Sequence, residues 1–497
     1  MPPHCDPPAF EHLMLSRSKA YSQVIAVDLD GTLVLTDTLH ESFLLMLKQD
    51  FFSILLLPFW LLQGKAVLKS NLAKRVSLNV ALLPYNQVLI EWLKEQKADG
   101  KKIVLTTAAD QHIANAVASH LGLFDDVFAS DGKTNNASFN KAHLLNNLFG
   151  QSSWDYVGNS KADLEVWKSA NHAIVVNAST SIIKKVHKTA GNVSLILSAR
   201  PVTANDWLKV FRVHQWLKNL LIFVPLLAAH QITNLEALWM LVEAFVAFSF
   251  CASAVYIAND LLDLDSDRLH PRKYRRPFAS GNIPISSGFF LAPILALLSL
   301  STALWVSHTF TLWLAGYFAV TCVYTLWIKK LILVDCLTLA GLYTLRIIAG
   351  ASVVSVAVSF WLLSFSVFIF LSLAFVKRFA ELQAQADAGG NIVQGRGYMV
   401  SDQSMIQTLG VTAGYASVLV FALYLQSESV LTLYAQPELI WLSVPLMLFW
   451  VSWIWMKAHR GQMHDDPIVF AIKDKVSLSV AVLVFLSFLL ASKGFAN

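Results

Sequence analysis

Residues 259–281 read N-D-L-L-D-L-D-S-D-R-L-H-P-R-K-Y-R-R-P-F-A-S-G and follow directly on an apolar run. At helical spacing, Asp260, Asp263 and Asp267 fall on one face, where three carboxylates repel one another unless a cation lies among them. Oxygen-only ligands favour Mg²⁺, which proteins usually share with substrate phosphates. The stretch therefore predicts a magnesium–diphosphate site, with Arg276 among the bases that hold further phosphate oxygens. The alternative is a solvated helix end followed by a basic loop. This alternative explains the Lys and Arg residues well, but it explains the regular spacing of the aspartates poorly.

The composition divides the chain into two halves. The 497 residues are too many for one ordinary domain, and 55% hydrophobic with only 14% charged residues is typical of a membrane protein. Up to about residue 199 the sequence is mixed and charged, as in a soluble domain, whereas long apolar runs follow from Leu220 onward. The net charge of +5 is modest and gives no indication of a nucleic-acid partner. The four cysteines show neither metal-ligand nor disulfide spacing, which predicts reduced thiols.

The first half carries a motif of phosphate chemistry. A buried-strand pattern over residues 24–27 leads into D-L-D-G-T at residues 28–32. In such a motif Asp28 would attack phosphorus and Asp30 would act as the acid/base. The small Gly31 permits the turn that follows the strand.

Three later stretches extend this pattern. A second strand pattern at residues 102–105 runs into Thr106 and Thr107, Lys141 lies within F-N-K-A-H, and residues 156–163 read Y-V-G-N-S-K-A-D. With the first motif, these stretches resemble the haloacid dehalogenase-like hydrolases over about residues 20–198. The resemblance implies an α/β Rossmann-like domain, residues 1–198, with a small helical cap at about residues 37–98.

The same resemblance implies roles for individual side chains. Thr107 would hold the phosphate through its hydroxyl, with Thr106 as the alternative, and Lys141 would balance the charge of the phosphoryl group. The residues implied in holding Mg²⁺ are Asp28, Asp30, Asn159 and Asp163.

The fourth motif departs from the family. These hydrolases usually have a glycine–aspartate pair where this chain has Gly158-Asn159. The loss of one carboxylate weakens Mg²⁺ binding without abolishing it, because Asp28 and Asp163 remain as ligands. A phosphatase that removes a phosphate and a catalytically silent scaffold therefore both remain open.

The cap has an apolar tip at residues 51–62, which read F-F-S-I-L-L-L-P-F-W-L-L. About 12 residues are too few to span a bilayer. The tip either lies in the membrane interface, flanked by Lys48, Lys65 and Lys69, or packs on its own domain.

The second half predicts a bundle of nine transmembrane helices. Residues 199–219 form an amphipathic join rich in Trp and basic residues, as expected at a membrane surface. The transmembrane domain follows as residues 220–497. Its apolar segments lie near residues 220–229, 237–258, 289–307, 310–328, 331–351, 359–376, 410–426, 439–456 and 476–491.

The charges between these segments predict the orientation. The connections near residues 230–236, 307–310, 352–358 and 427–438 contain no Lys or Arg, whereas the alternate connections carry many. The positive-inside rule places the charged connections in the cytoplasm. We therefore expect a multi-pass protein of the inner (plasma) membrane, with a cytoplasmic N-terminal domain and the C-terminus on the opposite side.

Nine helices with N-D-x-x-D-x-x-x-D after the second span resemble the UbiA superfamily of intramembrane prenyltransferases, over about residues 200–495. The matching residues are Asn259, Asp260, Asp263 and Asp267, together with Arg276-Pro277 and Gly281. The resemblance implies that these residues bind a Mg²⁺-diphosphate and that a lateral path admits a polyprenyl chain.

The stretch after the sixth span differs from the usual pattern. Aromatic prenyltransferases of this superfamily carry a second aspartate-rich motif there, where this chain has Lys377-Arg378-x-x-Glu381. Two cations suggest bound phosphate instead of a second metal. Asp335 and Arg346, at membrane depth, are either functional or a mutual ion pair. The remaining candidates for substrate binding are Lys218, Tyr324, Lys330, Arg396 and Tyr398.

Together these features resemble the decaprenyl-phosphate phosphoribosyltransferase branch. The branch implies phosphoribosyl pyrophosphate and a polyprenyl phosphate as substrates, and a fused hydrolase would then remove the 5-phosphate of the product. Prenyl transfer from a prenyl diphosphate to an aromatic acceptor is the second hypothesis. A non-catalytic lipid-binding protein is the third, although it predicts disrupted aspartates.

Overall fold

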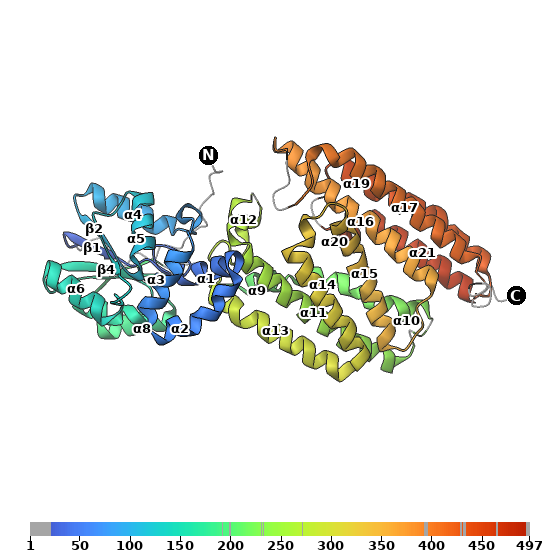
Figure 1. Cartoon of the computed structure of the whole chain (residues 1–497). Coiled ribbons are helices and arrows are strands. Elements are labelled where there is room, and N and C mark those ends of the chain that lie inside the picture. The colour runs from blue at the N-terminus through green and yellow to red at the C-terminus, as the bar shows by residue number, and fades with distance from the viewer. Residues whose placement is uncertain are drawn as a thin grey trace. The chain divides into compact units, whose positions relative to one another are not determined.

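The computed structural model describes residues 21–190, 192–197, 200–229, 231, 233–270, 272–391, 396–427, 430, 434–463 and 466–493 (Figure 1). Cys5, Pro271 and Asn497, on which parts of the sequence interpretation fall, lie outside these residues. The chain forms two compact units. The first comprises Met1–Val210 with Ile257–Leu291, and the second comprises Phe211–Tyr256 with Ala292–Asn497.

The first unit is built on a six-stranded parallel sheet in the order β3-β2-β1-β4-β5-β6. The strands are β1 (Val24–Val27), β2 (Lys102–Asp110), β3 (Asp126–Ser130), β4 (Trp154–Gly158), β5 (Ala173–Val176) and β6 (Val193–Leu197). This is the order of a doubly wound α/β fold, which confirms the predicted class. Val27 is in register with both Leu105 and Val157, so the carboxyl ends of β1, β2 and β4 lie side by side.

Helices cover both faces of this sheet. One core joins Ile25 and Val27 to α4 (Gln87–Ala98) and α5 (Gln111–Leu121). The opposite core joins Ala26 to α6 (Phe139–Phe149) and α7 (Leu164–Ser169), as the alternation of side chains along a strand requires. Helix α8 (Thr180–Thr189) contributes to the second core.

The cap consists of α1 (Thr38–Gln49), η1 (Phe51–Leu56), α2 (Leu57–Leu62) and α3 (Lys65–Arg75). It has a small core of its own, in which Met46, Trp60 and Leu72 are buried. Helix α4 falls within the predicted cap range, but its Leu89 and Leu93 pack into the core of the sheet. Short turns of 3₁₀-helix, η2 (Val80–Leu82) and η3 (Lys161–Asp163), complete the domain.

The apolar tip of the cap is largely uncovered within the first unit. Phe52 is 80% exposed and Leu62 is 85% exposed, whereas Trp60 is buried. The other exposed large side chains of the tip are Leu55, Leu56, Phe59 and Leu61. Membrane contact by this tip stays a prediction, and these six side chains are at least 37% exposed.

The aspartate-rich stretch belongs to the first unit by its contacts. The segment of the first unit that includes it, Ile257–Leu291, contains the end of α11 (Leu235–Leu262), α12 (Leu264–Leu269), η5 (Lys273–Arg275) and the start of α13 (Ile285–Val306). The single continuous helical face expected for the three aspartates is wrong. Asp263 has φ −103° and ψ 16°, which interrupts the helix and makes this residue the N-cap of α12.

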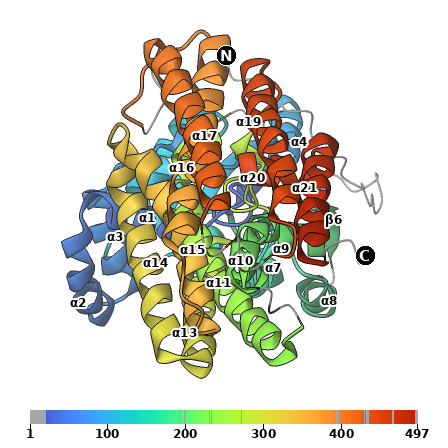
Figure 2. The same cartoon turned by 90° about the vertical axis from the view of Figure 1, so that its right-hand side faces the viewer.

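The second unit contains a bundle of helices, of which α15, α16 and α17 stand beside one another in Figure 2. Its elements are η4 (Val213–Phe223), α10 (Val224–Ala228), α14 (His308–Leu326), η6 (Ile328–Lys330), α15 (Val334–Val353), α16 (Phe360–Asp387), η7 (Val400–Asp402), α17 (Gln403–Leu425), η8 (Pro437–Leu442), α19 (Ser443–His459), α20 (Pro467–Lys473) and α21 (Lys475–Lys493), with the outer parts of α11 and α13.

Eight helices in the described part of the chain are long and apolar enough to cross a membrane, so the expected count of nine is one too many. The first expected segment forms only the short apolar stretch Val213–Ala228, most of which is 3₁₀-helix. The predicted join is also interrupted, because Arg212 at φ 50° separates α9 (Ala204–Phe211) from η4. The apolar windows of α13 and α14 are each only 17% buried, which leaves their outer faces for lipid.

Candidate functional sites

The candidate hydrolase site is centred on Asp28, the carboxylate that follows β1. The Lys141 ammonium donates hydrogen bonds to Asp28 Oδ1 and to the Tyr156 hydroxyl, each at 2.8 Å. It also lies 3.8 Å from Asp163 Oδ1. Burial raises the pKa of Asp28 to about 6, although Lys141 opposes this shift. Lys141 therefore contacts Asp28, the residue predicted as the nucleophile.

Asp163 is held by a network that the motif alone did not reveal. Its Oδ1 accepts a hydrogen bond of 2.6 Å from the Tyr156 hydroxyl, and its Oδ2 accepts from the amide and hydroxyl of Ser160 at 2.9 and 2.8 Å. Asn159 lies against the turn after β1, where a Cβ on Gly31 would come within 2.1 Å of its Nδ2. Gly31 has φ +74°, so both space and backbone conformation require glycine. Tyr156 was missed because it is an ordinary buried strand residue in the sequence.

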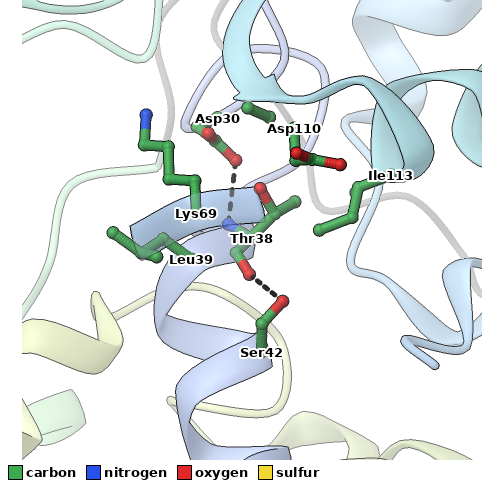
Figure 3. Close-up of a pocket in the computed structure, with 8 residues that line it drawn as sticks. Asp30, Thr38, Leu39, Ser42, Lys69, Asp110 and Ile113 are labelled. Atoms are coloured by element: carbon green, nitrogen blue, oxygen red, sulfur yellow. Dashed lines mark hydrogen bonds between the residues drawn. The ribbon is translucent and has the colours of Figure 1, made fainter. Parts of the chain in front are cut away.

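Asp30 lines a small pocket between the cap and the carboxyl end of the sheet (Figure 3). Its Oδ1 accepts a hydrogen bond of 2.8 Å from the backbone amide of Thr38, the first residue of α1. Burial, and then the nearby charge of Asp37, raises the pKa of Asp30 to about 7. The other lining residues are Leu39, Ser42, Lys69, Ala109, Asp110 and Ile113.

The two candidate threonines, Thr106 and Thr107, lie within β2 and are both fully buried. Thr107 Oγ1 accepts a hydrogen bond of 3.0 Å from the amide of Ala109. Thr106 Oγ1 is buried without a hydrogen-bond partner among the described residues. The choice between them as the phosphate-binding hydroxyl stays a prediction.

The aspartate-rich segment gathers two of its three acids around an arginine. Arg276 Nη1 lies 3.0 Å from Asp260 Oδ1 and 2.6 Å from Asp267 Oδ2. Both carboxylates are almost fully buried, whereas Arg276 is 28% exposed. Asn259 and Asp263 occupy the last turn of α11 and the break after it. The cation among these acids is therefore a guanidinium in this structure.

The donor set still fits Mg²⁺. Across the described ranges, no three His, Cys, Asp or Glu side chains are gathered as a metal cage. Two buried carboxylates nevertheless converge on one positive centre, and carboxylate oxygens are the donors that Mg²⁺ prefers. Burial raises the pKa of Asp267 even beside Arg276, and the charge of Asp260 adds to this effect. A second cation at this position would relieve the repulsion between the two acids.

In the second unit, six predicted residues form one network at the end of the membrane helices. Arg378 Nε lies 2.7 Å from Asp335 Oδ2, and Arg378 also pairs with Glu381 through Nη1. The Tyr398 hydroxyl donates a hydrogen bond of 2.6 Å to Asp335 Oδ1. Arg396 completes the network through Glu381, at 3.4 Å, and through the Tyr324 hydroxyl, at 3.0 Å.

A separate cluster surrounds an acid that the sequence interpretation missed. Asp466 Oδ2 lies 2.6 Å from Lys218 Nζ and 3.3 Å from Lys377 Nζ, with the Tyr343 hydroxyl 3.5 Å away. Burial opposes ionisation of Asp466, but the two ammonium groups outweigh it and hold its pKa well below the usual range. Two lysines against one carboxylate leave a net positive charge. The only sequence signal was the pair Asp466-Pro467, a common start for a helix.

Arg346 and Asp335 do not form the mutual ion pair that was one of the two expectations. Arg346 Nε donates to Asn219 Oδ1 at 3.0 Å, and its Nη2 donates to the Tyr317 hydroxyl at 2.9 Å. Asp335 pairs with Arg378 instead, because α15 and α16 pack side by side. Lys330 is exposed, and a Cβ on Gly397 would come within 2.5 Å of its carbonyl oxygen.

The sequence pattern of the UbiA prenyltransferase family matches residues 220–473. The chain belongs to this family. Like other members, it is a transferase-type integral membrane protein with many apolar helices.

Two relatives extend this assignment. The uncharacterized protein y4nM of Sinorhizobium fredii is 35% identical over 470 residues, which cover 93% of this UbiA-family chain and 90% of that protein. The decaprenyl-phosphate phosphoribosyltransferase of Mycolicibacterium smegmatis is 30% identical over 281 residues, which cover 54% of this chain and 86% of that protein. The branch suggested by the sequence is thus represented among its relatives.

Solved structures are more distant. A UbiA homolog from Archaeoglobus fulgidus bound to DMAPP and Mg²⁺ is 18% identical, with a TM-score of 0.45, over 57% of this chain and 99% of the homolog. A substrate-bound phosphoserine phosphatase complex is 18% identical, with a TM-score of 0.26, over 37% of this chain and 95% of the phosphatase. The N-terminal domain has the parallel sheet and flanking helices of a doubly wound α/β fold.

Proposed function

We propose that this UbiA-family protein transfers 5-phosphoribose from phosphoribosyl pyrophosphate to a polyprenyl phosphate, and that its N-terminal domain removes the 5-phosphate from the product. The observation that carries the transfer step is the cationic cluster of Lys218, Lys377 and Asp466. A net positive charge stands at the position after the sixth expected span, where an aromatic prenyltransferase would hold a second metal. Such a cluster suits an anionic substrate group better than a second cation.

The transfer step breaks the bond between the sugar C1 and the pyrophosphate oxygen, and both electrons leave with pyrophosphate. The new bond joins C1 to an oxygen of the lipid phosphate. That phosphate is already ionised, so the step needs no protein base. Asp260, Asp263 and Asp267 would hold Mg²⁺, which when bound neutralises the charge of the leaving pyrophosphate. Arg276, once displaced from the carboxylates, is a donor for a phosphate oxygen.

The hydrolase step begins with attack of the Asp28 carboxylate on the phosphorus of the 5-phosphate, which forms an aspartyl phosphate and releases the sugar 5-oxygen. Asp30 gives a proton to that oxygen, and water then hydrolyses the aspartyl phosphate to inorganic phosphate. A pKa of about 7 suits Asp30 to this exchange of a proton near neutral pH. Mg²⁺ would be held by Asp28, Asp30 and Asp163, and Asn159 can offer only a neutral oxygen.

The test of the transfer step uses membranes that contain the protein. They are incubated in parallel with phosphoribosyl pyrophosphate labelled in the ribose and with a labelled prenyl diphosphate plus an aromatic acceptor. We expect ribose label to enter the lipid fraction in a Mg²⁺-dependent manner. Label from the prenyl diphosphate in an aromatic product would instead support the second hypothesis, and no transfer in either arm would favour a lipid-binding protein.

The test of the hydrolase step is Asp28→Asn, which removes the nucleophile while keeping the size of the side chain. The variant should still make polyprenyl-phosphoryl-ribose but retain its 5-phosphate, as read by thin-layer separation of the labelled lipids. Identical products from the wild type and the variant, both phosphorylated, would mean that the N-terminal domain is silent on this lipid.

A further inference from the structure

A buried ion pair connects the cap of the hydrolase to the aspartate-rich segment. Arg268 Nη1 and Nη2 donate to the two carboxylate oxygens of Glu41 at 3.1 and 2.6 Å. The side chains are 6% and 4% exposed, respectively. Arg268 Nε donates to the carbonyl oxygen of Ala279 at 3.0 Å. The guanidinium is therefore bound along both of its edges, by a helix of the cap and by the loop that carries Arg276.

Further contacts of the first unit surround this pair. The ring of Phe289, near the start of α13, packs edge-on against His40 and Phe43 of α1, at 5.5 and 5.3 Å between centroids. Gly281 approaches the loop before α1 so closely that a Cβ would lie 2.6 Å from Leu35 Cβ. Helix α12 also packs against η2. The segment thus rests on the cap through apolar, close-packed and charged contacts.

The position of Arg268 gives the ion pair a consequence for the acids. Arg268 directly follows Asp267 in α12, and Asp267 shares Arg276 with Asp260. A bidentate arginine–carboxylate pair fixes orientation as well as distance. Since a short helix such as α12 has little stability of its own, its direction depends on what holds its side chains.

We propose that Glu41 is a positioning residue of the transferase. It holds Arg268 and so fixes α12, which places Asp267 beside Asp260 at the end of α11, in the arrangement that binds a metal-bound diphosphate. The hydrolase domain is then a structural part of the membrane enzyme's site as well as a second catalyst. The same helix, α1, donates the Thr38 amide to Asp30, so one helix supports the acids of both sites. This inference rests on the proposed function for the identity of the diphosphate, but the position of α12 can be measured without any reaction.

The experiment measures backbone hydrogen exchange in the full-length protein in detergent, with and without Mg²⁺ plus inorganic pyrophosphate. In the wild type we expect the two probes together to slow exchange over residues 264–276. Glu41→Gln should speed exchange there at least tenfold and lose the effect of the probes, while exchange in β4 stays unchanged. The matched control is Glu165→Gln, which removes an exposed pair with Lys168 and should change neither result.

A double-mutant cycle identifies the pair itself. The double variant should accelerate exchange no more than Arg268→Gln alone, because Arg268→Gln already breaks the pair with Glu41 and also loses the bond to Ala279. Transfer should fall at least tenfold in kcat, with the KM for the polyprenyl phosphate unchanged. Multiplying effects in the double variant, or unchanged protection in Glu41→Gln, would overturn the proposal. A wild type that shows the probe effect but transfers no phosphoribose would contradict the proposed substrate and leave the positioning role supported.

Discussion

The hydrolase site and the aspartate-rich segment each place two buried carboxylates around one cation, and they differ in how firmly the cation is held. Lys141 is 3% exposed and contacts Asp28, Tyr156 and Asp163. Arg276 is 28% exposed and follows a short 3₁₀ turn. The lysine is enclosed by its site, whereas the arginine reaches solvent, and under the proposed function it would exchange its acids for a phosphate. From this difference in exposure we predict that the cation is fixed in the first site and exchangeable in the second.

The largest effect is expected when an acid of the aspartate-rich segment is removed. Asp260→Asn and Asp263→Asn should each lower phosphoribose transfer by about 10²-fold or more, since a metal ion contributes several kcal/mol of charge stabilisation. The variants should remain folded in the membrane. The matched control is Asp265→Asn in the same segment, for which we expect little change. Full turnover of both variants at saturating Mg²⁺ would contradict a metal–diphosphate role.

Removing each cation tests the comparison directly. Lys141→Met should destabilise the first unit by about 3–5 kcal/mol, because it leaves Asp28 and Asp163 buried without their partner. Arg276→Met should cost only about 1–3 kcal/mol, because Arg276 itself is 28% exposed and water can replace part of its interaction with the two acids. Added Mg²⁺ should restore the thermal midpoint of the Arg276 variant fully and that of the Lys141 variant only in part, because Lys141 also donates to Tyr156 and no metal ion replaces that bond. Equal rescue of both would mean that the two cations are held alike.

The neighbouring cations of α16 extend the comparison to the second unit. Lys377 is 32% exposed, so Lys377→Ala should raise the KM for phosphoribosyl pyrophosphate about ten- to a hundredfold through the loss of a charge-assisted contact. Arg378 is buried against Asp335, so Arg378→Ala should instead destabilise the protein by about 3–5 kcal/mol. Kinetics and thermal unfolding of both variants measure the difference. A changed response to lipid length alone would move Lys377 to the lipid path.

The smallest effect is expected at Asn159 and tests whether this residue is a Mg²⁺ ligand of the candidate hydrolase site. Asn159→Asp restores the carboxylate that the fourth motif lacks, beside the turn at Gly31. We expect the Mg²⁺ concentration for half-maximal dephosphorylation to fall a few-fold, as an added anionic oxygen strengthens the site, with transfer unaffected. A titration of phosphate release against Mg²⁺ measures this. An unchanged requirement would mean that position 159 is not a ligand.

Much of the hydrolase site could be predicted because its residues follow strands of a parallel sheet. D-x-D-G-T after β1 and Lys141 on α6 come together at the carboxyl ends of β1, β2 and β4, which the fold class requires. Tyr156 and Asp466 could not be predicted. A tyrosine in a strand and an acid in a loop acquire a role only from partners that the fold brings to them.

The amino-acid sequence alone predicted the α/β domain, most of the membrane helices and the segregation of basic residues between them, because periodicity and hydropathy are properties of short segments. The sequence interpretation overestimated the number of transmembrane helices by one. It also missed the break at Asp263, because the non-helical backbone of this one residue leaves no mark in the pattern of apolar and polar residues. Only the tertiary structure decided which cation meets which acid. Glu41 and Arg268 lie 227 residues apart, and no local signal selects a partner at that separation. Burial then makes such a choice specific, since a carboxylate removed from water must be paired with the donors that the packing of helices brings within reach.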